Sequence, residues 1–466
     1  MLKTSKLLIF LILLTVTAGL ISCRKKDKID SNPSLMLNFS TDTVFFDTVF
    51  TTVGSVTQRL LVYNNNGSKI QVSSIQLAGG SQSNYSMNVD GVAATSVSDI
   101  DIPAHDSIYI FVKVTVNPQN QSTPFIVADS ILFMTNGNRQ SVKLVAWGQD
   151  AYFYKNFTIK GNTTWDSLKP RVIYGNLKVD TGATLTLLPG VKMFFHGNSE
   201  LDVSYNATLV IVGSLGHEVK FQGDRLDPFY RDLPGQWNGI YLKRGCKNNT
   251  ITYAIIKNGN YGISIDSIPS SPGPVLSIDN TIIQNVSYGG IYAYSTSVVS
   301  RNCVIGNCGG SSLAMIKGGN YRFRQLTIGN YWASSVRTAP SIYITNYTYN
   351  SKGKQISNDL TQARIENSII YGAESEEMYS DSTSAAHFSF RFENCLIKTG
   401  QRITNKFHFD SCFVNQDPRF IDPATYKYQI DSISPAIEKG ATATVPFDIL
   451  GSQRVNPPDL GAYNHK

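Results

Sequence analysis

One short phrase recurs four times between Thr252 and Asn330: Ile255-Ile256-Lys257-Asn258, Ile282-Ile283-Gln284-Asn285, Val304-Ile305-Gly306-Asn307 and Thr327-Ile328-Gly329-Asn330. The four asparagines are 27, 22 and 23 residues apart. This period is too short for a repeat of paired helices and is typical of a coil of short strands joined by turns. Asparagine tolerates left-handed backbone, and its amide can bond the asparagine of the next coil. The repeat therefore predicts stacked apolar pairs with an asparagine ladder at one corner.

Segments on both sides continue this pattern. Residues 177–191 form an opening coil, Gln236-Trp237-Asn238-Gly239-Ile240 forms a turn, and less regular coils contain Ile369-Ile370, Leu396-Ile397 and Phe413-Val414. With these segments the chain resembles the right-handed parallel β-helix repeat proteins of the pectate-lyase-like type. The resemblance implies a right-handed parallel β-helix over residues 151–420, with roughly nine to eleven coils from Leu177 onward, stacked at about 4.8 Å. It implies a fold and no particular reaction, because one architecture hosts many activities.

The C-terminal residues carry a second resemblance. Ser434-Pro435-Ala436-Ile437 and Pro458-Asp459-Leu460-Gly461-Ala462-Tyr463 resemble the closing segment that follows such helices in Bacteroidetes envelope proteins. That motif usually ends in Glu, whereas this chain has Asn464. The resemblance implies a C-terminal closing segment over residues 421–466.

The N-terminus has the pattern of a secretory leader. Lys3 and Lys6 precede an apolar run over residues 7–14, which is too short for a stable membrane span. The ending Leu20-Ile21-Ser22-Cys23 resembles a bacterial lipobox, which implies a signal peptide over residues 1–22 and acylation of Cys23. Acyl chains would anchor the protein in a membrane through a tether at residues 23–34. The alternative is an ordinary leader with a chance cysteine.

The resemblances together imply a lipid-anchored outer-membrane protein of a Bacteroidetes-type bacterium. Surface-exposed lipoproteins of that group often carry acidic residues after the cysteine, whereas here the run is Arg24-Lys25-Lys26-Asp27-Lys28. This difference favours the periplasmic face over the cell surface. The formal net charge of +7 is a mild excess and only weak evidence for a nucleic-acid partner. A secreted lipoprotein rarely meets nucleic acid, so we expect no such partner.

Residues 35–150 follow a different pattern from the coils. Residues 43–50 and 60–63 are strand-like, Asn64-Asn65-Asn66-Gly67 is a turn, and residues 108–116 alternate at period two. Strands at this spacing predict a small antiparallel β-sandwich. The segment resembles the immunoglobulin-like domains that precede repeat modules in envelope proteins. Two roles stay open: a binding module, or a spacer that covers the exposed strand edges of the coil.

Carboxylates limit the enzymatic possibilities. Two-carboxylate glycosidases and calcium-dependent lyases need several acidic groups, but no Asp or Glu occurs between Asn280 and Asn358. Acidic residues cluster in two other loops, which are the candidate catalytic or calcium sites: Asp224, Asp227 and Asp232, with Arg225 or Arg231 as partners, and Glu374, Glu376, Glu377 and Asp381. The alternative is that both loops are solvated surface.

The carboxylate-free stretch is rich in cations and aromatic rings. Rings offer flat faces to sugars and cations attract anionic groups, so this stretch predicts a site for an acidic glycan or a lipid headgroup. Exposed tyrosines on strands are the alternative. The candidate ligand-binding residues are Arg322, Arg324, Tyr292, Tyr294 and Trp332.

Apart from Cys23, five cysteines remain. A Cys303–Cys308 disulfide is one interpretation, whereas the shared position of Cys303, Cys395 and Cys412 before an apolar pair favours buried thiols stacked in the coil. No CxxC pair or Cys/His cluster predicts a structural zinc site, so we expect no metal or other cofactor, except calcium if the protein is a lyase.

Two hypotheses for the function follow. The first is a non-catalytic binding or scaffold protein that presents the long side of the coil to an envelope glycan or a membrane-protein complex. The second is a polysaccharide lyase or glycoside hydrolase acting on an acidic polysaccharide, with its site in one of the two acidic loops.

Overall fold

A computed structural model of the chain describes residues 28–266, 273–442 and 445–465. The chain divides into two compact units, one up to Gln149 and one from Asp150 onward. Both consist of β-strands, with two short 3-10 helices, η1 (Gly80–Gln82) and η2 (Pro423–Thr425). The predicted fold class, an all-β chain with a sandwich followed by a right-handed parallel β-helix, is confirmed. The predicted signal peptide and the lipidation site Cys23 lie outside the described residues.

The first unit packs two five-stranded sheets around an aliphatic core. Buried and exposed residues alternate along its strands, as period two requires for a half-buried sheet. All strand pairs are antiparallel except the parallel pair of β10 with β2. In spatial order the first sheet is β1 (Asn38–Phe39), β3 (Gln58–Asn64), β8 (Asp106–Val114), β5 (Tyr85–Val89) and β6 (Val92–Ala94), and the second is β2 (Thr43–Phe50), β10 (Asn138–Gln149), β9 (Phe125–Thr135), β4 (Ile70–Leu77) and β7 (Ser96–Ile102).

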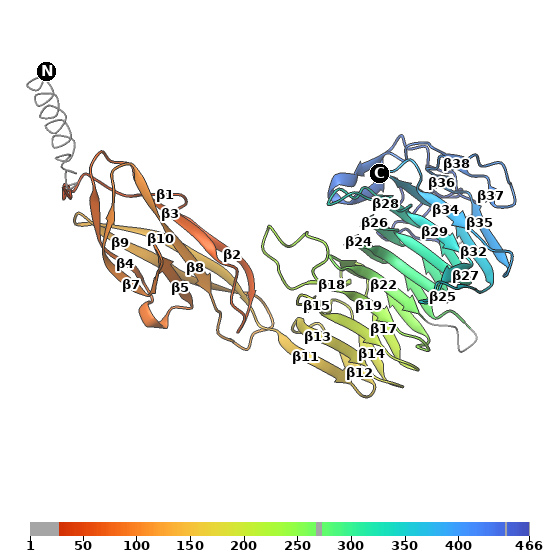
Figure 1. Cartoon of the computed structure of the whole chain (residues 1–466), viewed down its shortest axis with the longest axis horizontal. Coiled ribbons are helices and arrows are strands. Elements are labelled where there is room, and N and C mark those ends of the chain that lie inside the picture. Colours follow the sequence, from red (N-terminus) through yellow and green to blue (C-terminus); the bar gives the residue numbers. More distant parts are fainter. Residues whose placement is uncertain (1–27, 267–272, 443–444, 466) are drawn as a thin grey trace, which may run out of the picture. The chain divides into compact units, whose positions relative to one another are not determined.

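The second unit is a coil whose strands stack in parallel on three faces, which we name A, B and C in their order around each coil (Figure 1). Each strand pairs with the strand one coil later, so the register repeats from coil to coil. Strands β11 (Tyr152–Ile159) and β13 (Arg171–Val179) bend and contribute to faces C and A. Strands β25 (Gly289–Arg301) and β27 (Leu313–Arg324) bend and contribute to faces A and B.

The remaining strands belong to one face each. Face A holds β16 (Glu200–Val203), β19 (Gly239–Leu242), β22 (Tyr261–Asp266), β29 (Ile342–Thr345) and β34 (Met378–Asp381). Face B holds β12 (Thr163–Trp165), β14 (Thr184–Leu187), β17 (Thr208–Val212), β20 (Asn249–Thr252), β23 (Leu276–Asp279), β32 (Leu360–Glu366), β35 (Phe388–Glu393) and β37 (Phe409–Asp410). Face C holds β15 (Lys192–Phe195), β18 (Val219–Gly223), β21 (Ala254–Lys257), β24 (Ile282–Val286), β26 (Val304–Cys308), β28 (Thr327–Asn330), β33 (Ile369–Gly372), β36 (Leu396–Ile397) and β38 (Phe413–Val414). Two hairpins lie outside the faces: β30 (Tyr347–Tyr349) with β31 (Gln355–Ser357), and β39 (Phe420–Asp422) with β40 (Lys427–Ile430).

The predicted asparagine ladder is present at the end of the face C strands. Asn258, Asn285 and Asn307 have left-handed backbone. The amide of Asn285 donates to Asn258 Oδ1 at 2.9 Å, and that of Asn307 donates to Asn285 Oδ1 at 2.9 Å. Asn330 leaves the ladder, since its amide donates to the carbonyl of Gly310.

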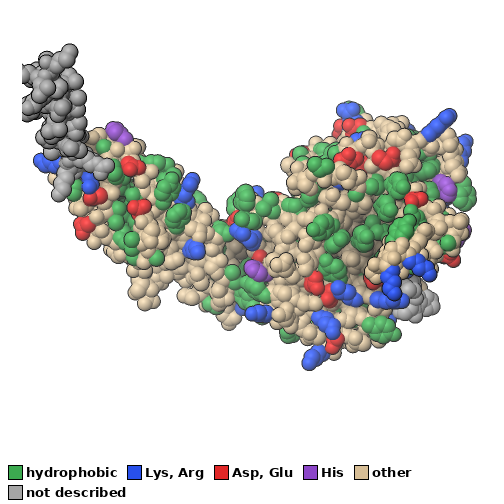
Figure 2. All heavy atoms as spheres, in the orientation of Figure 1, with side chains coloured by type: hydrophobic (Ala, Val, Ile, Leu, Met, Phe, Trp, Pro, Cys, Tyr) green, Lys and Arg blue, Asp and Glu red, His purple; other side chains and the backbone are tan. Residues whose placement is uncertain are grey.

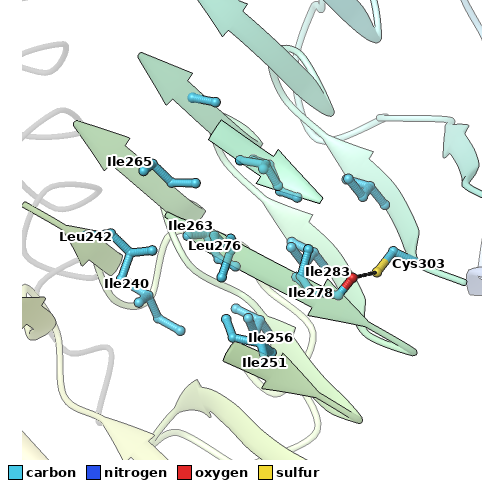
Figure 3. Packing of buried hydrophobic residues seen from close by; sticks show 14 of the residues in the cluster. Ile240, Leu242, Ile251, Ile256, Ile263, Ile265, Leu276, Ile278, Ile283 and Cys303 are labelled. Carbon is cyan, nitrogen blue, oxygen red and sulfur yellow. Dashed lines mark hydrogen bonds between the residues drawn. The ribbon is translucent and has the colours of Figure 1, made fainter. Parts of the chain in front are cut away.

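The interior of the coil is a continuous column of apolar side chains, mostly aliphatic with some aromatic rings. Figure 3 shows Ile240, Ile263, Ile256 and Ile283 pointing inward from neighbouring coils, where each is no more than 1% exposed. Strand side chains alternate between core and solvent, so the inward positions carry the hydrophobic effect and the outward positions are free to carry chemistry.

The cysteines follow the interpretation of buried thiols. All five described cysteines are free, and four of them are buried. A Cys303–Cys308 disulfide is wrong as a prediction, because both thiols are free: Cys303 precedes β26 and Cys308 ends that strand.

The C-terminal segment covers the outer side of face C. Tyr428 is fully buried there among Val304, Ile369 and Leu396. Gly306 and Gly329, the third residues of two repeat phrases, make room for it, since a Cβ on either would overlap the Tyr428 ring. The variable third position of the phrase therefore marks where the segment docks.

We expect the substitution Gly329→Val to displace the C-terminal segment. The added side chain overlaps the Tyr428 ring, and overpacking of this kind costs about 1–3 kcal/mol. Urea unfolding and limited proteolysis near Phe420 measure the effect. Gly197→Val is the matched control, because Gly197 lies in an exposed turn with no atom near its Cβ position. Equal stability of the two variants would contradict the docking described above.

Candidate functional site

A row of tyrosine rings runs along the outer side of face A. Register places Tyr292 beside Ala314, Ala314 beside Tyr343, and Tyr343 beside Tyr379 on successive coils. The rings of Tyr343 and Tyr379 stack at 5.7 Å between centroids with 9° between their planes. Ala314 interrupts the row, so Tyr292 and Tyr343 are two coil spacings apart, roughly 10 Å.

The gap over Ala314 is a groove of about 430 Å³. Tyr292 and Tyr343 line the groove on the two sides of Ala314, which is 2% exposed and forms its floor. The lining residues are Tyr261, Tyr288, Gly289, Tyr292, Gly309, Gly310, Ser311, Ala314, Ile316, Ala339, Pro340 and Tyr343. None of these described residues carries a charge at neutral pH.

Tyr261 forms the centre of one wall of the groove. Its ring lies 5.4 Å from that of Tyr288 and 5.8 Å from that of Tyr292, the latter in an edge-to-face arrangement. The wall at Gly309 and Gly310 consists of backbone, because a Cβ on either glycine would overlap a backbone carbonyl of the preceding coil. The groove therefore combines rigid aromatic faces with close backbone.

The hydroxyls of the groove are neutral donors and acceptors. Burial raises the pKa of Tyr261, Tyr292 and Tyr343 above the usual value, and neighbouring tyrosine hydroxyls raise it further. Uncharged hydroxyls beside apolar rings suit a ligand that has both polar groups and flat apolar faces.

The predicted ligand-binding residues do not form one site. Tyr292 and Tyr294 lie on face A, and the ammonium of Lys317 is 5.1 Å from the Tyr294 ring. Arg322 and Arg324 lie on face B. Trp332 follows face C, is 9% exposed and donates to Ser335 at 2.9 Å. Of the five, Tyr292 lines the groove.

Carboxylates from later coils neutralise the arginines of face B. Arg322 makes two hydrogen bonds with Glu366, at 2.7 and 3.1 Å, and Arg324 lies 3.3 Å from the same carboxylate. Arg364 and Arg391 continue the row with Glu366, Glu393 and Asp410. Sequence reasoning missed these pairs, because the carboxylates lie beyond the carboxylate-free stretch and reach the arginines only through stacking. Figure 2 shows acidic side chains interspersed among the basic ones over the visible side of the coil.

The ion pairs make the stability of the coil depend on pH. Burial raises the pKa of Glu366, but the hydrogen bond and charge of Arg322, with the charges of Arg364 and Arg324, outweigh it and lower the pKa below 4.5. A lowered native pKa stabilises the folded protein above the unfolded pKa, and this stabilisation disappears as pH falls through the native pKa.

We expect Glu366→Gln to lower the free energy of unfolding by roughly 1.5–3 kcal/mol at pH 7. The difference from wild type should shrink as the pH of the unfolding measurement falls through the lowered native pKa of Glu366. Asp410→Asn is the control, because Asp410 ends the row with a side chain that is 48% exposed, and it should cost less. A pH-independent difference for Glu366→Gln would contradict this linkage.

One carboxylate of the first acidic loop pairs with a histidine, a combination that is typical of acid–base catalysis. His196 Nδ1 lies 2.8 Å from Asp224 Oδ2, and the His196 ring lies 4.8 Å from the Tyr174 ring. The three residues follow the register of β13, β15 and β18 on successive coils. Burial raises the pKa of Asp224, although the hydrogen bond and charge of His196 oppose that shift. The His196 side chain is 55% exposed, so an oriented imidazole faces solvent.

The other carboxylates of that loop are held by cations. Asp227 lies 3.6 Å from Arg225, whose guanidinium covers the Tyr230 ring at 3.2 Å. Asp232 lies 3.2 Å from Lys257. Asp227 and Asp232 therefore belong to ion pairs with basic side chains, whereas Asp224 pairs with His196.

The second acidic loop is built around a buried ion pair. Glu377 is fully buried and receives two hydrogen bonds from Arg337, at 2.7 and 2.9 Å, and one from Ser341 at 2.6 Å. The backbone N–H of Glu374 also donates to it at 2.9 Å. Glu377 therefore holds the loop together, out of reach of a polymeric substrate.

Metal ligands do not converge in the described part of the chain: no group of three or more His, Cys, Asp or Glu side chains there could hold an ion. Within the same residues, no helix has the length and apolarity needed to cross a membrane.

Comparison with known proteins identifies no family, since no protein-family model and no curated protein matches the chain. Solved structures that match include a family 123 glycoside hydrolase from Clostridium perfringens, at 9% identity and TM-score 0.19, covering 28% of this chain and 30% of that one. A PapD-like domain of human CEP192 matches at 8% identity and TM-score 0.19, covering 28% of this chain and 98% of that domain. A protein of unknown function from Porphyromonas gingivalis W83 matches at 14% identity and TM-score 0.18, covering 27% and 60%. Similarities at this level carry no argument about function.

Proposed function

We propose that the protein is a non-catalytic, lipid-anchored outer-membrane protein that binds an envelope glycan in the groove on face A. The observation that carries the proposal is the uncharged groove itself, in which the small side chain of Ala314 separates Tyr292 from Tyr343 and tyrosine side chains line the space. Tyrosines provide stacking area at low entropic cost together with hydroxyls for hydrogen bonding.

The glycan that suits this groove is neutral. The lining residues carry no charge, and the arginines of face B that would attract an acidic polymer are paired with Glu366 and Glu393. The proposal therefore departs from the acidic glycan expected from sequence. Acylation of Cys23, with the periplasmic face favoured, would hold the coil at the membrane.

Two substitutions test the groove from opposite directions. We expect Tyr292→Ala to remove one stacking face and to weaken binding roughly 3–10-fold, because aromatic contacts contribute about 0.5–1.5 kcal/mol. Ala314→Phe should fill the gap and weaken binding by at least about tenfold. The measurement is calorimetric titration of the folded chain with a panel of neutral and acidic polysaccharides.

Tyr205→Ala is the matched control, because Tyr205 is 66% exposed and lies outside the groove. It should bind as wild type does. Unchanged affinity of Ala314→Phe, or binding that depends instead on Arg322 and Arg324, would overturn the groove as the site.

The second candidate function is a polysaccharide lyase or hydrolase, and the His196–Asp224 pair is the observation that favours it. A carboxylate that bonds Nδ1 orients the imidazole so that Nε2 can move a proton at a substrate. Tyr174 adds a second titratable group beside the ring, and burial raises its pKa.

If this candidate holds, Asp224→Asn should lower the rate of new chain ends on polysaccharides by about 100-fold or more, the usual range for general acid–base catalysis. Asp227→Asn is the control, since Asp227 is paired with Arg225. Wild-type protein without turnover on a panel whose reference enzymes are active would exclude this candidate, as would full activity of Asp224→Asn.

A further inference from the structure

Two cysteines occupy the same corner position on the last two coils. Leu396 pairs with Phe413 in register, so the residues before them, Cys395 and Cys412, stand side by side. Hydrogen bonds close the ladder on both sides of the pair, from Phe413 N to Cys395 O at 2.8 Å and from Asn394 N to Asp410 O at 2.9 Å. Adjacent strands are about 4.8 Å apart, which lies within the Cα separation of about 4.4–6.8 Å that a disulfide requires.

Both thiols point to the same inner side of the corner. Cys395 Sγ lies 3.3 Å from the carbonyls of Glu393 and Ile365. Cys412 Sγ lies 3.5 Å from the carbonyls of Asp410 and Phe392, which are the equivalent groups one coil later. Equal side-chain directions at neighbouring register positions bring the two sulfurs together.

Accessibility and acidity differ between the two thiols in a way that defines an order of reaction. Cys395 is buried, whereas Cys412 is partly exposed. The hydrogen bond from Cys395 lowers the pKa of Cys412, although burial and the nearby carboxylates oppose this shift. Burial, with the neighbouring Cys412, raises the pKa of Cys395. Cys412 is therefore the thiol that ionises first and meets a reagent first.

We propose that Cys395 and Cys412 form a disulfide that joins the last two coils, through exchange with a disulfide-bearing oxidant. The Cys412 thiolate attacks one sulfur of the oxidant, whose disulfide bond breaks and releases a thiolate. Cys395 then loses its proton to solvent and attacks Cys412 Sγ, which expels the second thiol of the oxidant. Two protein thiols are oxidised and one disulfide is reduced to two thiols.

The bond would fix the least supported coil. Its strands β37 and β38 have two residues each, and the segment between Ile397 and Phe409 contains no face A strand. A cross-link over residues 395–412 would restrict opening of this end of the coil.

Cys303 supplies an internal control. Its sulfur contacts the equivalent carbonyls, of Ile278 and Arg301, at 3.5 Å each. Its register neighbours are Thr281 and Leu326, so no thiol stands beside it. Thr281 and Ser368 at the same corner donate to the carbonyls of Asp279 and Glu366, at 2.9 and 2.7 Å, so a hydroxyl is accommodated at this position.

The test uses the folded full chain in oxidised glutathione at pH 8, followed by alkylation with N-ethylmaleimide, unfolding and tryptic peptide mapping. Cleavage after Lys398, Arg402 and Lys406 separates the two cysteines, so their peptides stay together only through a disulfide. We expect the linked pair, lighter by two hydrogens than the two thiol peptides, with Cys303 still reduced. Protease cleavage between residues 398 and 408 should slow several-fold.

Cys395→Ser keeps a donor at the corner and should trap Cys412 as a stable mixed disulfide with glutathione, whereas Cys303→Ser should leave the linked pair unchanged. A wild-type Cys412 that stays glutathionylated without closing on Cys395 would overturn the proposal. So would two reduced thiols under conditions in which the Cys395→Ser variant reacts.

Discussion

The left-handed corner between faces B and C is the constraint on which the coil depends. From β20 onward, each coil turns there through a single residue of positive φ, and the positions are Tyr253, Asn280, Asn302, Gln325, Asn367, Asn394 and Ser411. A corner of constant length keeps every later residue in the same register with the coil before it. Asparagine suits this conformation, and its amide can also bond the next coil, as Asn302 does with Asn280 at 3.1 Å.

Constant register converts the outer surface into columns. Residues more than 20 positions apart become neighbours, and each face acquires its own chemistry: tyrosines on face A, paired arginines and carboxylates on face B, and glycines on face C where Tyr428 docks. The same register brings His196 to Asp224 and Cys395 to Cys412. Each of these groups of residues therefore comes together only when the coils stack in this register.

The columns differ because charged, aromatic and glycine residues are stabilised by different neighbours. Charged groups on face B are stabilised by opposite charges at coil spacing, so an isolated cation there would be exceptional. The rings on face A carry no charge, and a single alanine interrupts their row at the groove. The glycines on face C are explained by the Tyr428 ring.

The sequence alone determined the fold class, the asparagine ladder and the lack of Asp and Glu between Asn280 and Asn358. These features depend on short stretches of sequence. The apolar pair and the asparagine are visible within one repeat, and the period is the spacing between neighbouring repeats. The structure decided which outward residues meet. Arg322 and Glu366 are 44 positions apart, and Tyr292 and Tyr343 are 51 apart, because loops of variable length separate the strands. Outward side chains obey no hydrophobic period, so only the register of the folded coil reveals the groove, the neutralised arginines and the cysteine pair.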